Sequence, residues 1–191
     1  MTPVRHCKWV DEVVEDAPSF EGNARKKAET LAQWLRQPQG AESESERGIA
    51  FVLADDSGLE VDALDGAPGV RSARFSADES GDAGNSADAD NNAKLLRLLS
   101  KTPLEQRSAR FRCVIALISV HPEGANRCFQ CFDGACEGRI GFEAKGDHGF
   151  GYDPLFVPNG FEQTFAQLGE ETKNRISHRS KALQQLKSAL A

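Results

Sequence analysis

The hydrophobic and polar positions of the chain repeat with helical spacing in two segments. The first predicts a helix over residues 19–37, for which Ser19 is a suitable N-cap residue. Its expected inward face consists of Ala24, Ala28, Leu31 and Leu35. The second predicts a closing helix over residues 177–190. Its expected inward face consists of Ala182, Leu183, Leu186 and Leu190.

Three further segments have the hydrophobic pattern of β-strands. Residues 49–54 are continuously apolar, as in a buried strand, and they stop at Asp55 and Asp56, where we expect a turn. Residues 109–119 and 127–138 alternate between apolar and polar positions over part of their length. They are therefore predicted to form a pair of strands, joined through the Pro and Gly between them.

Polar stretches separate these elements. Residues 37–48 combine charge with Pro and Gly, so we expect an exposed linker loop there. Residues 76–91 are rich in Ser, Gly, Asp and Asn, and they lead into a short helix predicted over residues 92–100. Helices and strands alternate without an internal repeat, which predicts one α/β domain over residues 1–191 with a mixed sheet.

Composition narrows the class of protein. No segment approaches the roughly 18 apolar residues of a membrane span, and the N-terminal residues are too polar for a secretory signal, so we expect a cytoplasmic protein without a membrane partner. The net charge of −6 argues against nucleic acid as a partner. The 5 cysteines, in a chain without an export signal, are expected to be reduced thiols.

The sequence Asp55-Asp56-Ser57-Gly58 is the first candidate site. Two adjacent carboxylates repel each other unless a cation or a set of donors lies between them. A Mg²⁺ ion takes one or two carboxylates and completes its shell with water and phosphate oxygens, so this sparse cluster suits it. The alternative is a purely structural Asx-type turn.

Two further segments carry unusual chemistry. Residues 146–154 hold several glycines, two aromatic residues and Asp153, which suits a backbone that a ligand approaches closely and a ring that stacks on a base. Residues 173–179 gather four basic side chains in an acidic chain, and these suit phosphate oxygens or the polar edge of a base. The structural alternatives are a glycine-rich turn and a solvated helix start.

Two metal motifs are incomplete. Cys128 and Cys131 have the spacing of half a zinc site, but their segment alternates like a strand. Asp88, Asp90 and Asn92 begin like a calcium loop, whose required glycine and bidentate glutamate are both missing. We therefore assign neither metal.

Taken together, five motifs resemble the Ham1/inosine triphosphate pyrophosphatase family, and they occur in the order of that family. They are residues 19–24, 54–62, 66–74, 149–154 and 173–179. The resemblance implies an elongated, two-lobed α/β fold in which helices flank a long, mixed, twisted sheet. It also implies a homodimer.

The resemblance implies hydrolysis of ITP, dITP and XTP to the monophosphate and pyrophosphate, which clears non-standard purines from the nucleotide pool. Asp56 matches the catalytic aspartate, which accepts a proton from water and contacts Mg²⁺. Asp55 and Glu15 are the further expected metal ligands. Ser57 matches a residue that contacts the substrate. The residues expected to bind or read the base are Phe150, Gly151, Tyr152, Asp153, Lys173, His178 and Arg179.

The N-terminal segment departs from the family pattern. Residues 1–10 lack the Thr/Ser-x-Asn-x-x-Lys motif that holds the triphosphate in the family, so the chain is expected to be shortened there. Three readings follow: an active pyrophosphatase in which Lys8 or Arg5 replaces that motif, a relative that binds nucleotide or dimerises with little turnover, and a metal-dependent hydrolase of another phosphoanhydride.

Overall fold

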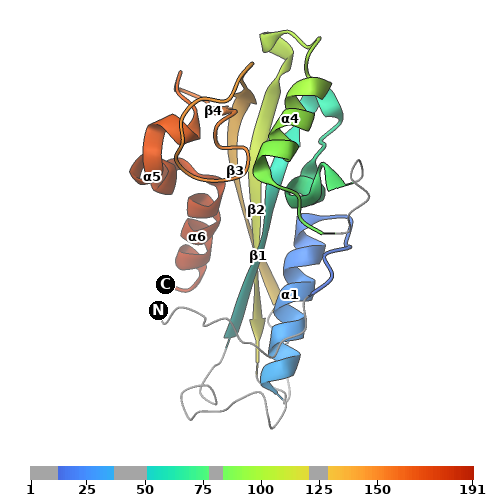
Figure 1. The fold of residues 1–191 in the computed structure, drawn as a ribbon. Coiled ribbons are helices and arrows are strands. Elements are labelled where there is room, and N and C mark those ends of the chain that lie inside the picture. Colours follow the sequence, from blue (N-terminus) through green and yellow to red (C-terminus); the bar gives the residue numbers. More distant parts are fainter. Residues whose placement is uncertain (1–12, 37–50, 78–83, 121–128) are drawn as a thin grey trace. The chain divides into compact units, whose positions relative to one another are not determined.

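The computed structural model describes residues 13–36, 51–77, 84–120 and 129–191 (Figure 1). The chain divides into two compact units. Unit 1 is drawn from residues 1–56 and 115–131, and unit 2 from residues 57–114 and 132–191. The single domain over residues 1–191 stays a prediction, and the predicted linker at residues 37–48 lies outside the described residues.

A four-stranded sheet with the order β1-β2-β3-β4 is the scaffold. The strands are β1 (Phe51–Val61), β2 (Ser108–Ser119), β3 (Phe129–Ile140) and β4 (Phe156–Pro158). Strand β3 pairs antiparallel with β4, and Gly138 lies opposite Pro158. The helices are α1 (Phe20–Leu35), α4 (Asp88–Leu98), α5 (Phe165–Ile176) and α6 (His178–Ala189), with 3₁₀ turns η1 (Asp62–Leu64), η2 (Gly69–Arg74) and η3 (Leu104–Gln106). The predicted α/β class is confirmed.

The predicted turn at Asp55 and Asp56 is wrong, because β1 continues through both residues. The strand alternation continues as well, so Asp56 is buried on the same side as Val52, while Asp55 is exposed. The alternative Asx-type turn is excluded for the same reason. Adjacent aspartates and a glycine resembled a turn in composition, but sheet pairing overrides that local preference.

Helix α1 is the main helix of unit 1 and lies alongside the unit's strand segments (Figure 1). The predicted cap is confirmed, since the Ser19 hydroxyl accepts a hydrogen bond from the Gly22 amide at 3.1 Å. The buried face holds Ala24, Ala28 and Ala32, whereas the predicted Leu31 is only partly buried. Small side chains on that face permit a close approach of the helix backbone to the strands.

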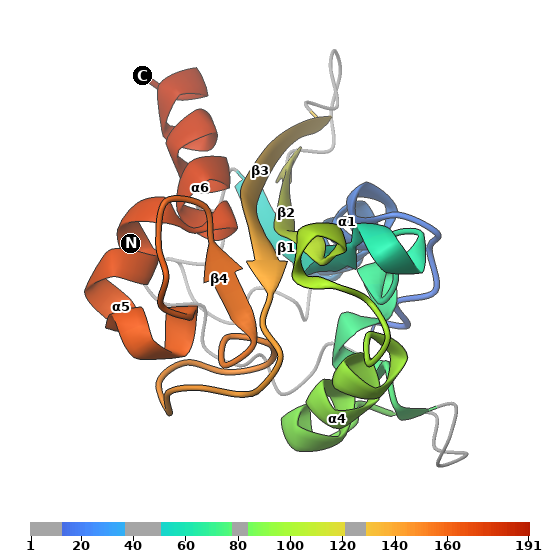
Figure 2. The ribbon, with the colours of Figure 1, turned by 90° about the horizontal axis from the view of Figure 1, so that it is seen from above.

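In unit 2 one face of the sheet is buried beneath helices. The core joins apolar residues of all four strands with residues of α4 and α5, including Leu59, Leu95, Phe111, Phe156 and Phe165. The rings of Phe111 and Phe156 pack with centroids 4.7 Å apart. Figure 2 shows α5 next to both β4 and α6 in this unit.

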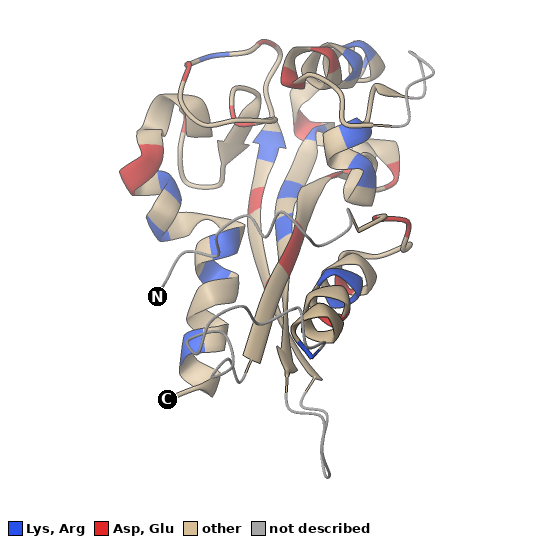
Figure 3. Ribbon diagram, turned by 60° about the horizontal axis from the view of Figure 1, so that its bottom comes forward, with Lys and Arg blue, Asp and Glu red and all other residues tan. Residues whose placement is uncertain are grey.

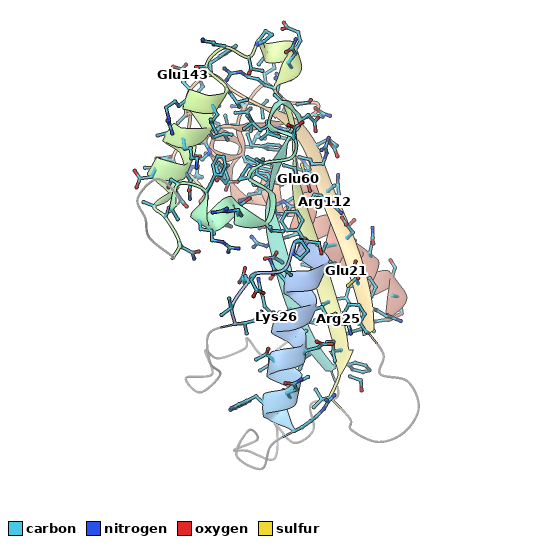
Figure 4. All side chains as sticks on the ribbon, turned by 90° about the vertical axis from the view of Figure 1, so that its right-hand side faces the viewer. Glu21, Arg25, Lys26, Glu60, Arg112 and Glu143 are labelled. Atoms are coloured by element: carbon cyan, nitrogen blue, oxygen red, sulfur yellow. The ribbon has the colours of Figure 1, made fainter. Side chains whose placement is uncertain are left out.

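The opposite face of the sheet in unit 2 is charged. Arg110 pairs with Glu60, Asp62 and Glu137, and Arg112 pairs with Glu60 and Asp133. Figure 3 shows the basic and acidic positions along the strands, and Figure 4 places Glu60 next to Arg112. We call these six residues the ion-pair lattice. Residues two apart on neighbouring strands face the same side, which is why the lattice forms.

Helix α6 matches the predicted closing helix in position but not in its buried face. Ser177 caps it by accepting from the Ser180 amide at 3.2 Å. Ala182 and Leu186 are buried as predicted, whereas Leu183 is 47% exposed and Leu190 is 61% exposed. The helix instead buries His178, because its backbone lies directly on β3, where a Cβ atom on Gly134 would come within 2.1 Å of the His178 carbonyl oxygen.

Three other elements differ from the prediction. Helix α4 begins at Asp88 rather than residue 92, because Asn91 is turned inward and its side-chain oxygen accepts from the Ser76 amide at 2.8 Å. Helix α5 and strand β4 were not predicted. A reciprocal pair of hydrogen bonds between Thr164 and Gln167 begins α5.

The described cysteines are Cys113, Cys131 and Cys136, and none of the three forms a disulfide. Cys113 and Cys136 are buried, and burial raises the pKa of the Cys136 thiol. Cys128 lies outside the described residues, so the structure does not address its pairing with Cys131. None of the described helices is both long and apolar enough to cross a membrane.

Candidate functional site

Four polar residues of unit 1 are linked by ion pairs and a hydrogen bond, and we call them the acid–lysine cluster: Glu15, Asn23, Lys27 and Asp56. The Lys27 Nζ lies 2.9 Å from Asp56 Oδ1 and 3.0 Å from Glu15 Oε1. It also donates to the main-chain oxygen of Asp55 at 2.9 Å. Asn23 Nδ2 donates to the other oxygen of Asp56 at 3.1 Å.

The secondary structure explains why these residues meet. Asn23 and Lys27 are four residues apart in α1 and therefore lie on the same side of the helix. Asp56 projects from the buried side of β1. The Ala17 amide donates to Asn23 Oδ1 at 2.9 Å, which holds the segment that carries Glu15 against the start of α1.

Burial dominates the electrostatics of Asp56, which is only 6% exposed. Burial raises the pKa of Asp56, against the opposing effect of its hydrogen bonds from Lys27 and Asn23. Burial alone would lower the pKa of Lys27, but its hydrogen bonds to Asp56 and Glu15 and their charges outweigh it and raise that pKa. The cluster thus holds a charged lysine beside a carboxylate with increased proton affinity, a combination suited to a general base.

The oxygen atoms around Lys27 are the kind that Mg²⁺ prefers. They come from the carboxylates of Glu15 and Asp56 and from the main chain of Asp55. No group of three or more His, Cys, Asp or Glu side chains suited to a metal occurs among the described residues. Two carboxylates nevertheless fit Mg²⁺, which completes its shell with water and substrate oxygens. The Asp55 side chain is on the exposed side of β1, so its carbonyl oxygen is the atom that faces the cluster.

In unit 2 the segment from Gly149 to Asp153, here called the aromatic loop, forms a tight turn. The Asp153 amide donates to the Phe150 carbonyl at 3.2 Å, and the Phe150 amide donates to Asp153 Oδ2 at 3.0 Å. Gly149 has φ of +79° and Gly151 has φ of +60°, a conformation that favours glycine. The turn leaves the Phe150 side chain 61% exposed.

Basic side chains from two helices lie against the Phe150 ring. Lys173 of α5 has its Nζ 4.5 Å from the ring centroid, and Arg179 of α6 has its Cζ 5.6 Å from it. Lys173 also forms an ion pair with Asp153, which is 1% exposed. The structure therefore brings together Phe150, Asp153, Lys173 and Arg179, all predicted from the sequence to contact the base.

Two other predicted base-binding residues face the core of unit 2. Tyr152 is buried, its hydroxyl donates to the Ser72 carbonyl at 2.9 Å, and burial raises its pKa. His178 is buried and stacks on Phe111 with ring centroids 5.0 Å apart. Ser57 follows Asp56 in β1 and is partly buried.

Sequence reasoning missed Asn23 and Lys27. Lys27 is the second of two adjacent lysines in a helix, a pattern typical of a solvated face. The available signal was Asn23, a polar residue that adjoins the inward Ala24 and lies four residues before Lys27. A buried polar group in that position needs a partner, and here the partner is Asp56.

The family model described as Ham1 family matches residues 2–189 of the sequence. The chain belongs to the Ham1 family. Relatives of the chain that are called dITP/XTP pyrophosphatase include proteins from Opitutus terrae and Desulforamulus reducens. The protein from Opitutus terrae is 46% identical over 92% of this chain and 75% of the relative. The protein from Desulforamulus reducens is 49% identical over 90% of this chain and 74% of the relative.

Solved structures of Ham1 proteins have the same fold. The Staphylococcus aureus Ham1 protein is 37% identical, with a TM-score of 0.73 over 94% of this chain and 80% of that chain. The nucleoside-triphosphatase, dITP/XTP pyrophosphatase from Mycobacterium abscessus is 38% identical, with a TM-score of 0.67 over 92% of this chain and 78% of that chain. Membership of the family and the α/β fold class that the five sequence motifs imply are thereby confirmed.

Proposed function

We propose that this Ham1 family member hydrolyses ITP, dITP and XTP to the nucleoside monophosphate and pyrophosphate, and so clears non-standard purines from the nucleotide pool. The observation that carries the proposal is the buried Asp56, held between Lys27 and Asn23. The relatives from Opitutus terrae and Desulforamulus reducens are named for two of these substrates, dITP and XTP, which supports the proposal.

The acid–lysine cluster acts on the triphosphate in this proposal. Asp56 accepts a proton from the attacking water as the new bond from oxygen to the α-phosphorus forms and the bond to the bridging oxygen breaks, so that pyrophosphate leaves. The raised proton affinity of Asp56 favours this transfer. Lys27 carries a positive charge that offsets the negative charge growing on the phosphoryl oxygens.

We further propose that Mg²⁺ is the cofactor, held by Glu15 and Asp56. When bound, the ion neutralises phosphate charge and polarises the phosphoryl group. Lys27 already places a single positive charge among the same oxygens, which indicates that this position favours a cation. From its membership of the family we also propose that the protein forms a homodimer and is located in the cytoplasm.

The aromatic loop binds the purine in this proposal. The exposed face of Phe150 stacks on the base, and Arg179 and Lys173 supply donors beside the ring. Arg179 is exposed, and Lys173 forms an ion pair with Asp153. A donor directed at the 6-oxo group of hypoxanthine or xanthine has no acceptor when adenine presents an amino group there, and this disfavours ATP.

The experiment that tests the function is release of pyrophosphate from ITP, dITP and XTP, with ATP and GTP as comparison substrates. Each reaction is run with Mg²⁺ and with a chelator in its place. We expect Mg²⁺-dependent release that favours ITP, dITP and XTP over both ATP and GTP. Binding of ITP without release would instead support the nucleotide-binding relative, and equal release from all five would support a general phosphoanhydride hydrolase.

A further inference from the structure

Both main-chain polar groups of Gly151 are held by side chains of α4. The Gly151 amide donates to Asp88 Oδ2 at 2.6 Å, and Asn92 Nδ2 donates to the Gly151 carbonyl at 3.0 Å. Asp88 and Asn92 are four residues apart, so they lie on the same side of the helix. We call these two residues the Gly151 clamp.

The clamp has a cost to the rest of the structure. Asp88 stands in the first turn of α4, and Ala87 at the N-cap position makes no side-chain capping hydrogen bond. A polar side chain at the N-cap ordinarily accepts a hydrogen bond from the free amides of the first turn, and α4 begins without one. The Asp88 carboxylate instead accepts from the aromatic loop. Asn92 in turn leaves its Oδ1 buried without a hydrogen-bond partner among the described residues. The hydrogen bond to Gly151 orients the side-chain amide of Asn92, although this orientation leaves a buried acceptor unpaired, which is unfavourable.

The remainder of the aromatic loop is held as well. Tyr152 is tied to η2 by its hydrogen bond to Ser72. Asn91 ties η2 back to α4, because its Nδ2 donates to the Ala73 carbonyl at 3.3 Å. Helix α4 therefore supports the loop directly at Gly151 and indirectly through η2. Phe150, immediately before the clamped glycine, is the large exposed side chain of the loop.

We propose that Asp88 and Asn92 are positioning residues for purine recognition, which fix the Gly151 peptide and so hold the Phe150 ring where a base stacks on it. This inference rests on the proposed function, and it adds two residues that contact the main chain of Gly151. A loop ordered during folding loses little further conformational entropy when a ligand binds. Loss of the clamp therefore weakens nucleotide binding and changes the chemical step little.

The first test requires no substrate. Amide hydrogen exchange is measured at residues 149–153 in the wild type and in Asp88→Ala, Asn92→Ala and Asp90→Ala. Asp90 lies in the same acidic first turn and is exposed, so Asp90→Ala is the matched control for charge and helix start. We expect exchange in the loop to rise about tenfold in the two clamp variants and to stay unchanged in the control. Unchanged exchange in the clamp variants would refute the clamp.

The second test separates positioning from stability. We expect Asp88→Ala and Asn92→Ala to raise KM for ITP about fivefold, as loss of one hydrogen bond suggests, with kcat within about twofold of the wild type. Asp88→Asn retains an oxygen that accepts from the Gly151 amide, so it should restore KM. A KM equal to that of Asp90→Ala, or an Asp88→Asn variant as weak as Asp88→Ala, would overturn the positioning role.

The two tests also distinguish this inference from the proposed function. A wild-type protein that neither binds nor hydrolyses ITP would refute the proposed function. It would also refute the role of the Gly151 clamp in purine binding. Exchange that rises in the clamp variants while KM matches the control would refute only the positioning role.

Discussion

Two opposing effects act on the carboxylate of Asp56. Its buried position disfavours the negative charge, and two hydrogen-bond donors favour it. Burial is the larger effect and raises the pKa, while Lys27 and Asn23 hold the carboxylate in place. A side chain kept charged in an unfavourable position is typical of a functional residue, because stability alone would select an uncharged one. The residue therefore contributes more to chemistry than to folding in our interpretation.

Replacement of Asp56 by Asn tests that interpretation. Asp56→Asn keeps the shape and removes the proton acceptor, so we expect kcat for pyrophosphate release from ITP to fall by about a thousandfold. The melting temperature should stay within about 3 °C, because a buried charge with an unfavourable pKa shift is removed. Asp16→Asn is the matched control, since Asp16 pairs with the neighbouring Lys26 and is exposed. Retained turnover in Asp56→Asn would exclude it as the base.

Arg179 gives a second prediction at the scale of one residue. Arg179→Ala removes the exposed guanidinium beside the Phe150 ring, so KM for ITP should rise between about tenfold and a hundredfold. KM for ATP should change little, because adenine offers no acceptor at that position. Arg175→Ala, which removes an exposed arginine of α5, controls for net charge. An equal rise for ITP and ATP would assign Arg179 to phosphate binding instead.

The sequence singles out individual residues as candidates where their type is unusual for their place. Asp56 stood out because two carboxylates follow an apolar run, and Arg179 because cations gather in an acidic chain. Lys27 did not, since a lysine in a helix is ordinary until its partner is known. The partner, Asp56, is 29 residues away along the chain. Local patterns carry no information about that contact.

At the scale of elements, β3 and the backbone of α6, the helix that carries Arg179, are in close contact at Gly134. Gly134 has no side chain, and the backbone of α6 occupies the space that one would fill. A Cβ atom there would lie 2.5 Å from the Ala182 amide nitrogen. Because backbone atoms cannot rotate away, α6 must move as a whole.

Gly134→Ala should therefore displace α6 together with Arg179. We expect the free energy of unfolding to fall by about 2 kcal/mol, the range of overpacked cores, and KM for ITP to rise. Urea unfolding and steady-state kinetics measure the two effects. Gly84→Ala is the control, because a Cβ atom on Gly84 meets nothing within 4 Å and its φ is not positive. Equal stability of the two variants would contradict the packing described for Gly134.

Elements were predictable where periodicity was long and their ends were marked. Helix α1 has its cap at Ser19, and the strands β2 and β3 alternate between apolar and polar positions over part of their length. Helix α5 was missed because Gly169, with φ of +76°, interrupts its pattern, and β4 has only 3 residues. The site depends on tertiary packing, because the packing of α5 in unit 2 places Lys173 beside Phe150.

At the scale of the whole molecule, the ion-pair lattice gives stability a dependence on pH. The hydrogen bond from Ser108, followed by the contacts with Arg110, lowers the pKa of Asp62. A carboxyl group with a lowered pKa in the folded state stabilises the fold above its unfolded pKa of about 3.9. That stabilisation is lost as pH falls through the folded pKa, which lies below this value.

We therefore expect Asp62→Asn to lower the free energy of unfolding at pH 7 by at most about 0.5 kcal/mol, since the pair is partly exposed and screened by water. The difference from the wild type should disappear as pH falls through the folded pKa of Asp62. Urea unfolding at several pH values measures this. Asp147→Asn is the control, because the Asp147 side chain is 95% exposed. A difference that persists unchanged at the lowest pH would contradict the electrostatic origin.

The reactivity of the buried thiols of β2 and β3 reports how often the protein transiently unfolds. Cys113 is 0% exposed and Cys136 is 4% exposed, so an alkylating reagent reaches them only in molecules that have transiently unfolded around the sheet. Cys131 is partly buried, so we expect it to react more readily and to serve as a reference for reagent strength in the same chain. Labelling followed by mass spectrometry would thus measure how often the fold opens, and a nucleotide that binds the folded state would slow the labelling of Cys113 and Cys136 in proportion to its affinity.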